Sequence, residues 1–344
     1  MTTSGQRETW VDNVKSFACL LVVLGHFAQS MVRSGIASPN DLYSWFQATI
    51  YTFHVPLFFI CSGYLYQRNA WTNSPSLWWG SVKKKLLTLG VPYVAFTLIT
   101  LGMKLFASDD VNSPASDPLA TLFLNPTSPY WYLYTLFLLF LLTPTAKDEA
   151  QPARMLALAL ILKTLSLLGV GGGLPFAVTS VMGNDVWFVA GMCLRSFGWV
   201  ERLGGGSALI GLMFLPLSVV ANAHGSGPWT SFTVGCLACT FVVSSALVCS
   251  SRVSQPHVLS LCARYSFPVF LMHTIFAAGA RIILLKLGFV DLGVQVVFGL
   301  LASVGGPVVA MYVMEKLKPL DFIVYPSRYI KMGEDKGRGD VSGA

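Results

Sequence analysis

Ten apolar runs in this chain approach the length of a bilayer-spanning helix, and they constrain its fold more than any other feature. A helix needs about 20 mostly apolar residues to cross the hydrocarbon core, which is about 30 Å thick. Backbone polar groups in lipid must bond within the protein, and a helix achieves this. We therefore predict an all-α fold, a polytopic membrane helix bundle of about ten transmembrane helices. The runs are 13–32, 45–66, 84–106, 130–145, 154–172, 176–195, 207–222, 230–250, 265–287 and 294–314.

Composition supports a membrane protein and argues against a soluble domain. Hydrophobic residues make up 54% of the chain and charged residues only 11%, whereas soluble domains carry about 25% charged residues. We expect a single transmembrane domain over residues 1–330, followed by a polar, disordered cytoplasmic tail over 331–344. The segment 107–129 is predicted to be the longest external loop.

Basic residues divide unevenly between the two ends of the predicted helices. With a cytoplasmic N-terminus, 18 of the 23 Lys and Arg residues fall at cytoplasmic helix ends and five do not. Cytoplasmic ends of membrane helices accumulate Lys and Arg, so we predict a multi-pass protein of the cell membrane with both termini cytoplasmic. This topology also accounts for the net charge of +7. The lipid bilayer is therefore an expected partner, and a nucleic acid is not. The five exceptions are Arg33, Lys104, Lys163, Arg281 and Lys286.

Lys15 and His26 are the first candidate functional residues. They lie eleven residues apart in or beside the first apolar run, a spacing that returns to nearly the same helix face after about three turns. An ionisable group at bilayer depth is costly unless it faces the protein interior or a wet cavity. A neutral structural histidine bonded to a backbone carbonyl is the alternative for His26.

Two further histidines fall at similar depths. At about 1.5 Å per residue, His26 lies about 20 Å from the cytoplasmic end of its helix and His54 about 15 Å from the outer end of the next. His273 lies about 12 Å from the cytoplasmic end of the run 265–287. Three helices could therefore bring three imidazoles to one cavity. Pro56 is expected to open the second helix just past His54, because proline lacks a backbone N–H.

A second set of polar residues is predicted at the cytoplasmic ends. Lys15 starts the first run, Ser62 approaches the inner end of the second, and Glu315 follows the last. Ionic anchors at a membrane boundary are common, so an anchoring role stays open for Lys15 and Glu315. Cys236 and Cys239 form a C-x-x-C inside an apolar run without a partner pair, and no metal site is expected.

These residues carry a resemblance to a known family. Lys15 and His26 match an Arg/Lys-x10-His motif, and Phe58-Phe59-Ile60-Cys61-Ser62-Gly63 matches F-F-x-x-S-G. Together they resemble the acyltransferase-3 superfamily of integral membrane acyltransferases, in particular its fucose 4-O-acetylase-like branch.

The resemblance implies an O-acyltransferase reaction. An acyl group, usually acetyl, would pass from cytoplasmic acyl-CoA to a hydroxyl of a cell-surface carbohydrate or its lipid-linked precursor. The expected donor substrate is acetyl-CoA. His26 would be the general base or an acyl carrier, and His54 would orient the acceptor or donate to the carbonyl oxygen. Lys15, Ser62 and Glu315 would form the donor-binding set. The basic residues Lys83, Lys84 and Lys85 would attract CoA.

Several alternatives stay open. A membrane transporter or flippase would also bury polar groups at mid-membrane, and a non-catalytic sensor or scaffold could keep the helices without transfer. The sequence does not identify the acceptor or the acyl chain. A homo-oligomer and a separate transfer protein both stay open as partners of this chain. The roles of His273, Asp185, Lys163 and Arg281 are also undetermined.

Overall fold

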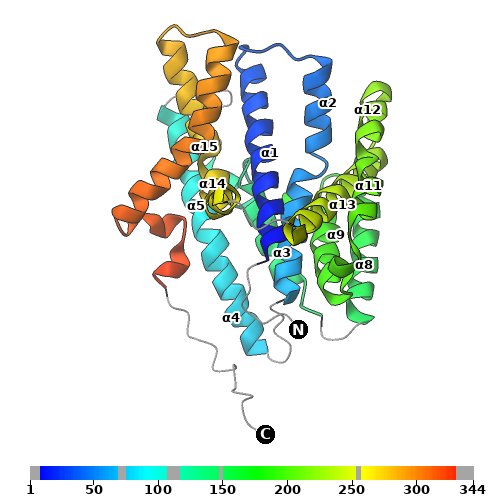
Figure 1. Cartoon of the computed structure of the whole chain (residues 1–344). Coiled ribbons are helices and arrows are strands. Elements are labelled where there is room, and N and C mark those ends of the chain that lie inside the picture. The colour runs from blue at the N-terminus through cyan, green and yellow to red at the C-terminus, as the bar shows by residue number, and fades with distance from the viewer. Residues whose placement is uncertain (1–7, 69–74, 107–116, 147–149, 253–256, 331–344) are drawn as a thin grey trace.

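Helices make up all the regular structure of the described residues. The computed structural model describes residues 8–68, 75–106, 117–146, 150–252 and 257–330. In Figure 1, α1 runs upward through the middle of the molecule and α15 runs downward, so the start of α1 and the end of α15 are the lower ends of these two helices. The helices are α1 (Thr9–Arg33), α2 (Asp41–Ile50), α3 (His54–Arg68), α4 (Pro75–Lys85), the π-helix η1 (Leu86–Gly90), α5 (Val91–Phe106), α6 (Pro118–Phe123), α7 (Trp131–Leu142), α8 (Ala150–Leu167), α9 (Phe176–Ser196), α10 (Trp199–Arg202), α11 (Gly205–Leu212), α12 (Phe214–His224), α13 (Pro228–Arg252), α14 (His257–Lys286), α15 (Leu292–Lys316) and the 3-10 helices η2 (Leu320–Ile323) and η3 (Pro326–Arg328).

The prediction of a polytopic helical membrane protein is confirmed. Among the described residues, eight helical stretches are long and apolar enough to span a bilayer, and each coincides with a predicted run. The other two predicted runs correspond to α7, with 12 residues, and α8, with 18. Since α7 is about 18 Å long at 1.5 Å per residue, it cannot cross the hydrocarbon core alone. The predicted count of ten is therefore supported for eight spans.

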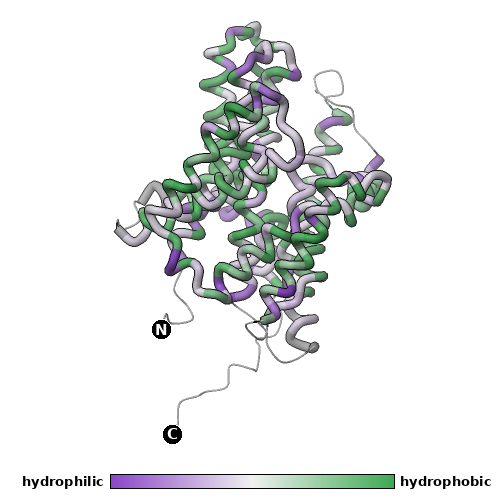
Figure 2. The backbone as a smooth tube through the Cα atoms, turned by 90° about the vertical axis from the view of Figure 1, so that its right-hand side faces the viewer, coloured by the Kyte–Doolittle hydropathy of each residue, from purple (hydrophilic) through white to green (hydrophobic). Residues whose placement is uncertain are grey.

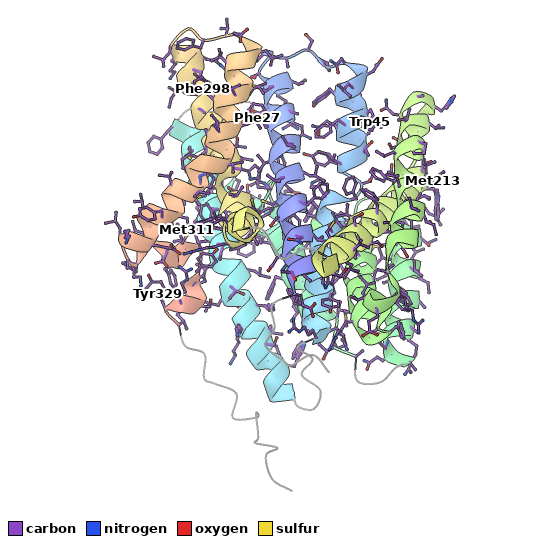
Figure 3. All side chains as sticks on the ribbon, viewed as in Figure 1. Phe27, Trp45, Met213, Phe298, Met311 and Tyr329 are labelled. Carbon is purple, nitrogen blue, oxygen red and sulfur yellow. The ribbon has the colours of Figure 1, made fainter. Side chains whose placement is uncertain are left out.

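The surface of the bundle is apolar along most of its length. Figure 2 shows hydrophobic residues along most helices and hydrophilic ones near several of their ends. Large apolar side chains face outward, among them Met213 at 59% exposure and Phe298 at 55% (Figure 3). An exposed apolar surface of this extent is expected where lipid, rather than water, surrounds a protein.

The second predicted span is broken before His54, so the prediction that Pro56 opens it just past His54 is wrong. The chain leaves α2 at Ile50 and re-enters a helix, α3, at His54. Pro56 falls in the first turn of α3, where a missing N–H removes no helical hydrogen bond. The His54 side chain caps the break, because its Nδ1 lies 2.6 Å from the Ile50 carbonyl oxygen.

A close helix crossing fixes α3 in the bundle. Helix α3 packs between α1 and α9. A Cβ on Gly63 would lie 1.9 Å from the carbonyl oxygen of Phe188, and one on Gly191 would lie 2.0 Å from that of Ile60. The backbones of α3 and α9 therefore touch directly, as small residues allow between membrane helices. The glycine of the F-F-x-x-S-G motif thus has a packing role.

One predicted feature lies wholly outside the described residues and another lies partly outside them. The tail 331–344 and residues 107–116 of the predicted external loop lie outside the described residues. The rest of that loop includes the short helix α6, where the Asp117 carboxylate accepts a hydrogen bond from the Ala120 N–H at 2.6 Å.

Candidate active site

A cavity of about 480 Å³ lies between α1, the α2–α3 break and helices α7, α8, α9, α13 and α14. Its walls include the first residues of α7 and α13 and the last residue of α8. The start of α1 lies at the other end of the bundle, where Glu8 contacts Arg68 of α3 at 3.4 Å. We call these the cavity end and the Glu8 end. The lining residues are Val22, His26, Ala48, Tyr51, Thr52, His54, Val55, Pro56, Ser128, Pro129, Trp131, Tyr132, Lys163, Leu167, Asn184, Trp187, Pro228, Ser231, Phe232 and Phe270.

Three histidines gather at one end of the cavity. His26 and His54 line it, and the Tyr51 ring contacts both, with centroid separations of 6.2 Å to His26 and 4.6 Å to His54. The His273 ring lies 5.4 Å from the His26 ring but is not part of the cavity lining. The structure thus brings together the imidazoles that the sequence places at similar depths, with His273 behind His26.

Hydrogen bonds distinguish the three imidazoles. Nδ1 of His54 lies 2.6 Å from the Ile50 carbonyl, and Nδ1 of His273 lies 3.0 Å from that of Phe270. A carbonyl only accepts, so in each neutral ring Nδ1 carries the hydrogen and Nε2 the lone pair. Nε2 of His273 is buried and has no hydrogen-bond partner within the described structure.

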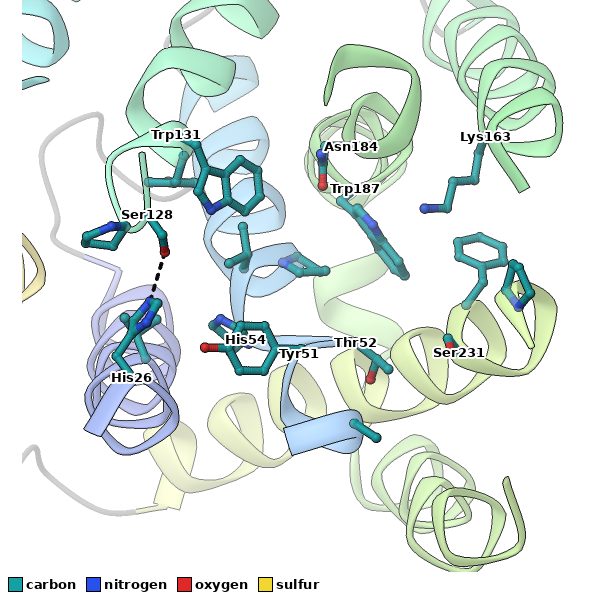
Figure 4. A pocket seen from close by; sticks show the side chains of 18 of the residues that line it. His26, Tyr51, Thr52, His54, Ser128, Trp131, Lys163, Asn184, Trp187 and Ser231 are labelled. Atoms are coloured by element: carbon teal, nitrogen blue, oxygen red, sulfur yellow. Dashed lines mark hydrogen bonds between the residues drawn. The ribbon is translucent and has the colours of Figure 1, made fainter. Parts of the chain in front are cut away.

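His26 differs from the other two, because its Nε2 meets a hydroxyl. That nitrogen lies 3.4 Å from Oγ of Ser128, which precedes α7 (Figure 4). A hydroxyl either donates or accepts, so this contact permits both neutral tautomers of His26. In the tautomer with its hydrogen on Nδ1, Nε2 of His26 accepts a hydrogen bond from this hydroxyl.

The F-F-x-x-S-G motif supports the cavity wall from behind. Tyr132 lines the cavity, and its hydroxyl lies 3.4 Å from Oγ of Ser62. The rings of Phe58 and Phe59 pack on Tyr132 with centroid separations of 5.5 and 5.0 Å. Phe270 completes this aromatic cluster at 5.6 Å from Tyr132. Ser62, predicted to contact the donor, is buried behind Tyr132 and does not line the cavity.

Lys15 lies at a different level from His26, nearer the Glu8 end. It is within electrostatic range of Cys61 on α3 and of Lys85 at the end of α4. Helices α1 and α3 run in opposite directions. Lys15, early in α1, therefore lies near Cys61, in the middle of α3, whereas His26, late in α1, lies near His54 at the start of α3. Lys83 and Lys84 are exposed, whereas Nζ of Lys85 lies 4.2 Å above the Phe140 ring. Lys15 and Lys85 thus lie within electrostatic range of each other, and the Asp12 carboxylate acts on the same cysteine as Lys15.

Within the described structure, Glu315 makes no hydrogen bond or ion pair with Lys15 or Ser62 and contacts two arginines instead. Its carboxylate lies 2.9 Å from Nη1 of Arg328 and 3.7 Å from Nη2 of Arg264. Arg328 also contacts Asp321 at 2.9 Å, and the Tyr329 hydroxyl donates to the same carboxylate. Burial opposes ionisation of Asp321, but the bonds from Tyr329 and Arg328 outweigh it and hold the pKa of its carboxyl below the usual value. These contacts make Glu315 part of a charge cluster that ties η2 and η3 to α15.

The cavity also contains polar residues that sequence analysis did not assign to it. Nζ of Lys163 donates to the Gly183 carbonyl at 2.9 Å and lies 5.3 Å from the Phe232 ring centroid. Asn184 stands beside it, with Nδ2 2.8 Å from the Ser180 carbonyl. The only sequence signal for Lys163 was its place among the basic residues that break the topological pattern.

Two other undetermined polar residues lie outside the cavity lining. Asp185 accepts a hydrogen bond from the Thr143 hydroxyl at 3.1 Å. Arg281 donates to the Ser30 hydroxyl at 2.7 Å. The first contact joins the end of α7 to α9, and the second joins α14 to α1.

Comparison with known proteins relates nearly the whole chain to one family. A family model described as an acyltransferase domain, that of the acyltransferase-3 family, matches residues 8–312. The match contains every residue that lines the cavity. No curated protein and no solved structure matches the chain.

Proposed function

The chain belongs to the acyltransferase-3 family and is a membrane acyltransferase, and we propose that it moves an acetyl group from acetyl-CoA to a hydroxyl of a carbohydrate. The acceptor would be a cell-surface glycan or its lipid-linked precursor, as in the fucose 4-O-acetylase-like branch that the N-terminal motifs resemble. One observation carries the proposal: a hydroxyl, that of Ser128, already lies 3.4 Å from Nε2 of His26 inside the cavity. An acceptor hydroxyl in the same place, drawn to a hydrogen-bond distance of about 2.6–3.2 Å, would lose its proton to the imidazole.

The proposed reaction uses the histidines in distinct roles. His26 takes the proton of the acceptor hydroxyl while the hydroxyl oxygen bonds to the thioester carbonyl carbon. The carbon–sulfur bond then breaks, and the proton passes from His26 to the leaving sulfur, so that the products are an acetyl ester and free CoA. His54 has its Nδ1–H on the Ile50 carbonyl, so its Nε2 accepts from the acceptor and orients it. Of the two earlier roles for His54, this favours orientation of the acceptor.

The donor would approach from the Glu8 end. Lys15 lies nearer to that end than His26, and Lys15 and Lys85 are two positive charges within range of each other. CoA is an anionic molecule with phosphate groups. Ammonium groups bind phosphate as point charges. We propose Lys15 as the donor contact and leave Ser62 and Glu315 out of it, because Ser62 supports Tyr132 and Glu315 pairs with two arginines.

The proposal is tested with purified protein in liposomes, supplied with acetyl-CoA labelled in the acetyl group. Release of free CoA and transfer of label to added cell-surface glycans are measured together. Both should depend on the protein and on His26. A protein that moves a solute across the liposome membrane without consuming acetyl-CoA would instead be a transporter, and the proposed reaction would be wrong.

Topology gives a second expectation. We propose that the protein lies in the cell membrane with both termini cytoplasmic, because 18 of its 23 Lys and Arg residues fall at the helix ends that the sequence predicts to be cytoplasmic. Ser342→Cys should then resist a membrane-impermeant maleimide in intact cells, and Ser113→Cys should react. The unsubstituted protein controls for its native cysteines. Labelling of Ser342→Cys in sealed cells would contradict the proposed orientation. The proposed side of entry for the donor would then be wrong as well.

Lys15 provides a prediction about donor binding. Lys15→Ala should raise KM for acetyl-CoA by about tenfold or more, the value of one lost charge-assisted contact, with a smaller change in kcat. Lys15→Arg should keep much of the affinity, because the charge remains although its geometry differs. Lys316→Ala, which removes an exposed lysine at the end of α15, is the matched control. An unchanged KM in Lys15→Ala would identify the residue as an interfacial anchor.

A further inference from the structure

The wall of the cavity opposite His26 carries a positive charge. Figure 4 shows His26 and Ser128 at one end of the cavity and Lys163 at the other, with His54, Tyr51 and Trp187 between them. Lys163 is on α8, four residues before the helix ends at Leu167. Its neighbours come from α9, the next helix in the chain, and from α13, which is distant in sequence. The ammonium is thus held at a defined place by three helices.

This charge has no protein counter-ion in the described structure. No carboxylate pairs with Lys163 among those residues, and no Asp or Glu lines the cavity. Asp185, close by in sequence to Asn184, bonds to Thr143 instead. An ammonium has three N–H donors, and one of them is used by the Gly183 carbonyl. The group therefore retains donors for a ligand.

Membrane proteins usually satisfy such a lysine in another way. A lysine near a helix end extends its ammonium to the interface, or it pairs with an acid in the bundle. Lys163 instead lies over the Phe232 ring and lines the cavity. Keeping a cation in this position is costly unless an anion arrives to compensate it.

The neighbouring walls suit a sugar ring. Trp131 and Trp187 contribute aromatic surface, while Asn184 and Ser231 add an amide and a hydroxyl. Aromatic faces combined with a few polar groups are the usual composition of small-molecule sites, and the volume of about 480 Å³ falls in their range of about 300–1,000 Å³. The cavity can therefore hold a saccharide unit between Lys163 and His26.

We propose that the acceptor is an anionic saccharide, whose carboxylate or phosphate binds Lys163 while one of its hydroxyls reaches His26. This rests on the proposed function and narrows its acceptor class. The contact with Lys163 is non-covalent, and the charged group takes no part in the acetyl transfer itself. Lys163 is accordingly a specificity residue, set at the far side of the cavity from the base.

The test uses envelope glycans extracted from cells that lack the gene, with labelled acetyl-CoA and the reconstituted protein. One portion of the glycans is left intact, one has its carboxylates reduced to alcohols, and one is dephosphorylated with aqueous hydrofluoric acid. We expect one of the two treatments to lower kcat/KM for the glycans by about tenfold or more. The effective treatment identifies the anion as a carboxylate or a phosphate.

Variants connect that preference to Lys163. Lys163→Gln should lose the difference between intact and treated glycans, and Lys163→Arg should keep most of it. Lys286→Gln, which removes an exposed lysine outside the cavity, should behave like the unsubstituted protein. If neither treatment changes transfer, or if Lys163→Gln keeps the full preference, the anionic subsite is refuted while the acetyltransferase proposal stands. If acetyl-CoA is not consumed with any glycan, the proposed function itself fails.

Discussion

Replacing His26 with alanine is expected to lower acetyl transfer by about 10²–10⁴-fold, the usual contribution of a general base. The reason is the geometry of the cavity: His26 Nε2 is the imidazole nitrogen that meets a hydroxyl, at 3.4 Å from Ser128. The substitution enlarges an existing cavity instead of opening a new void in a packed core. Folding and acetyl-CoA binding should therefore be nearly unchanged. Single-turnover transfer by purified protein measures the loss.

Two comparisons make this result specific. His224→Ala removes an exposed histidine at the end of α12 and should leave transfer intact. His54→Ala should be damaging, whereas His54→Gln should recover part of the rate if the role of His54 is to hydrogen-bond the acceptor. Near-normal transfer by well-folded His26→Ala protein would disprove the mechanism. His273, whose buried Nε2 lacks a partner within the described structure, would then be the next candidate base.

The second large effect is expected from Gly191→Ala. The new Cβ would lie 2.0 Å from the Ile60 carbonyl oxygen and 2.9 Å from the Tyr64 nitrogen. Both are backbone atoms, so relief requires α3 and α9 to separate along their crossing. Overpacking in a well-packed core costs about 1–3 kcal/mol and occasionally more, out of a typical total of about 5–15 kcal/mol. We expect a clearly lower Tm and less monodisperse protein in detergent.

The matched control is Gly102→Ala on α5. No atom lies within 4 Å of a Cβ built there, and alanine favours a helix over glycine by about 1 kcal/mol. Gly102→Ala should therefore keep or raise Tm. Equal Tm values for the Gly102 and Gly191 variants would contradict the direct backbone contact. Because α3 carries His54, activity should fall together with stability in Gly191→Ala, unlike in His26→Ala.

The sequence was sufficient for the properties that depend on local composition and helical period. Apolar runs of bilayer length predicted the helical membrane fold, because lipid leaves the backbone few alternatives. The 3.6-residue period predicted that Lys15 and His26 share one face of their helix. Counting residues along helices also placed three histidines at similar depths, since rise per residue hardly varies within a helix.

Tertiary packing decided which of these residues meet, because contacts between distant segments depend on helix order and crossing. The crossing at Gly63 and Gly191 sets α3 in place, and the break before His54 turns its side chain to the Ile50 carbonyl. Packing also brought Lys163 into the cavity, a contact between helices that no local pattern encodes. The same long-range contacts paired Glu315 with arginines. Local sequence thus determined the helices and their faces, and the assembled bundle determined the site.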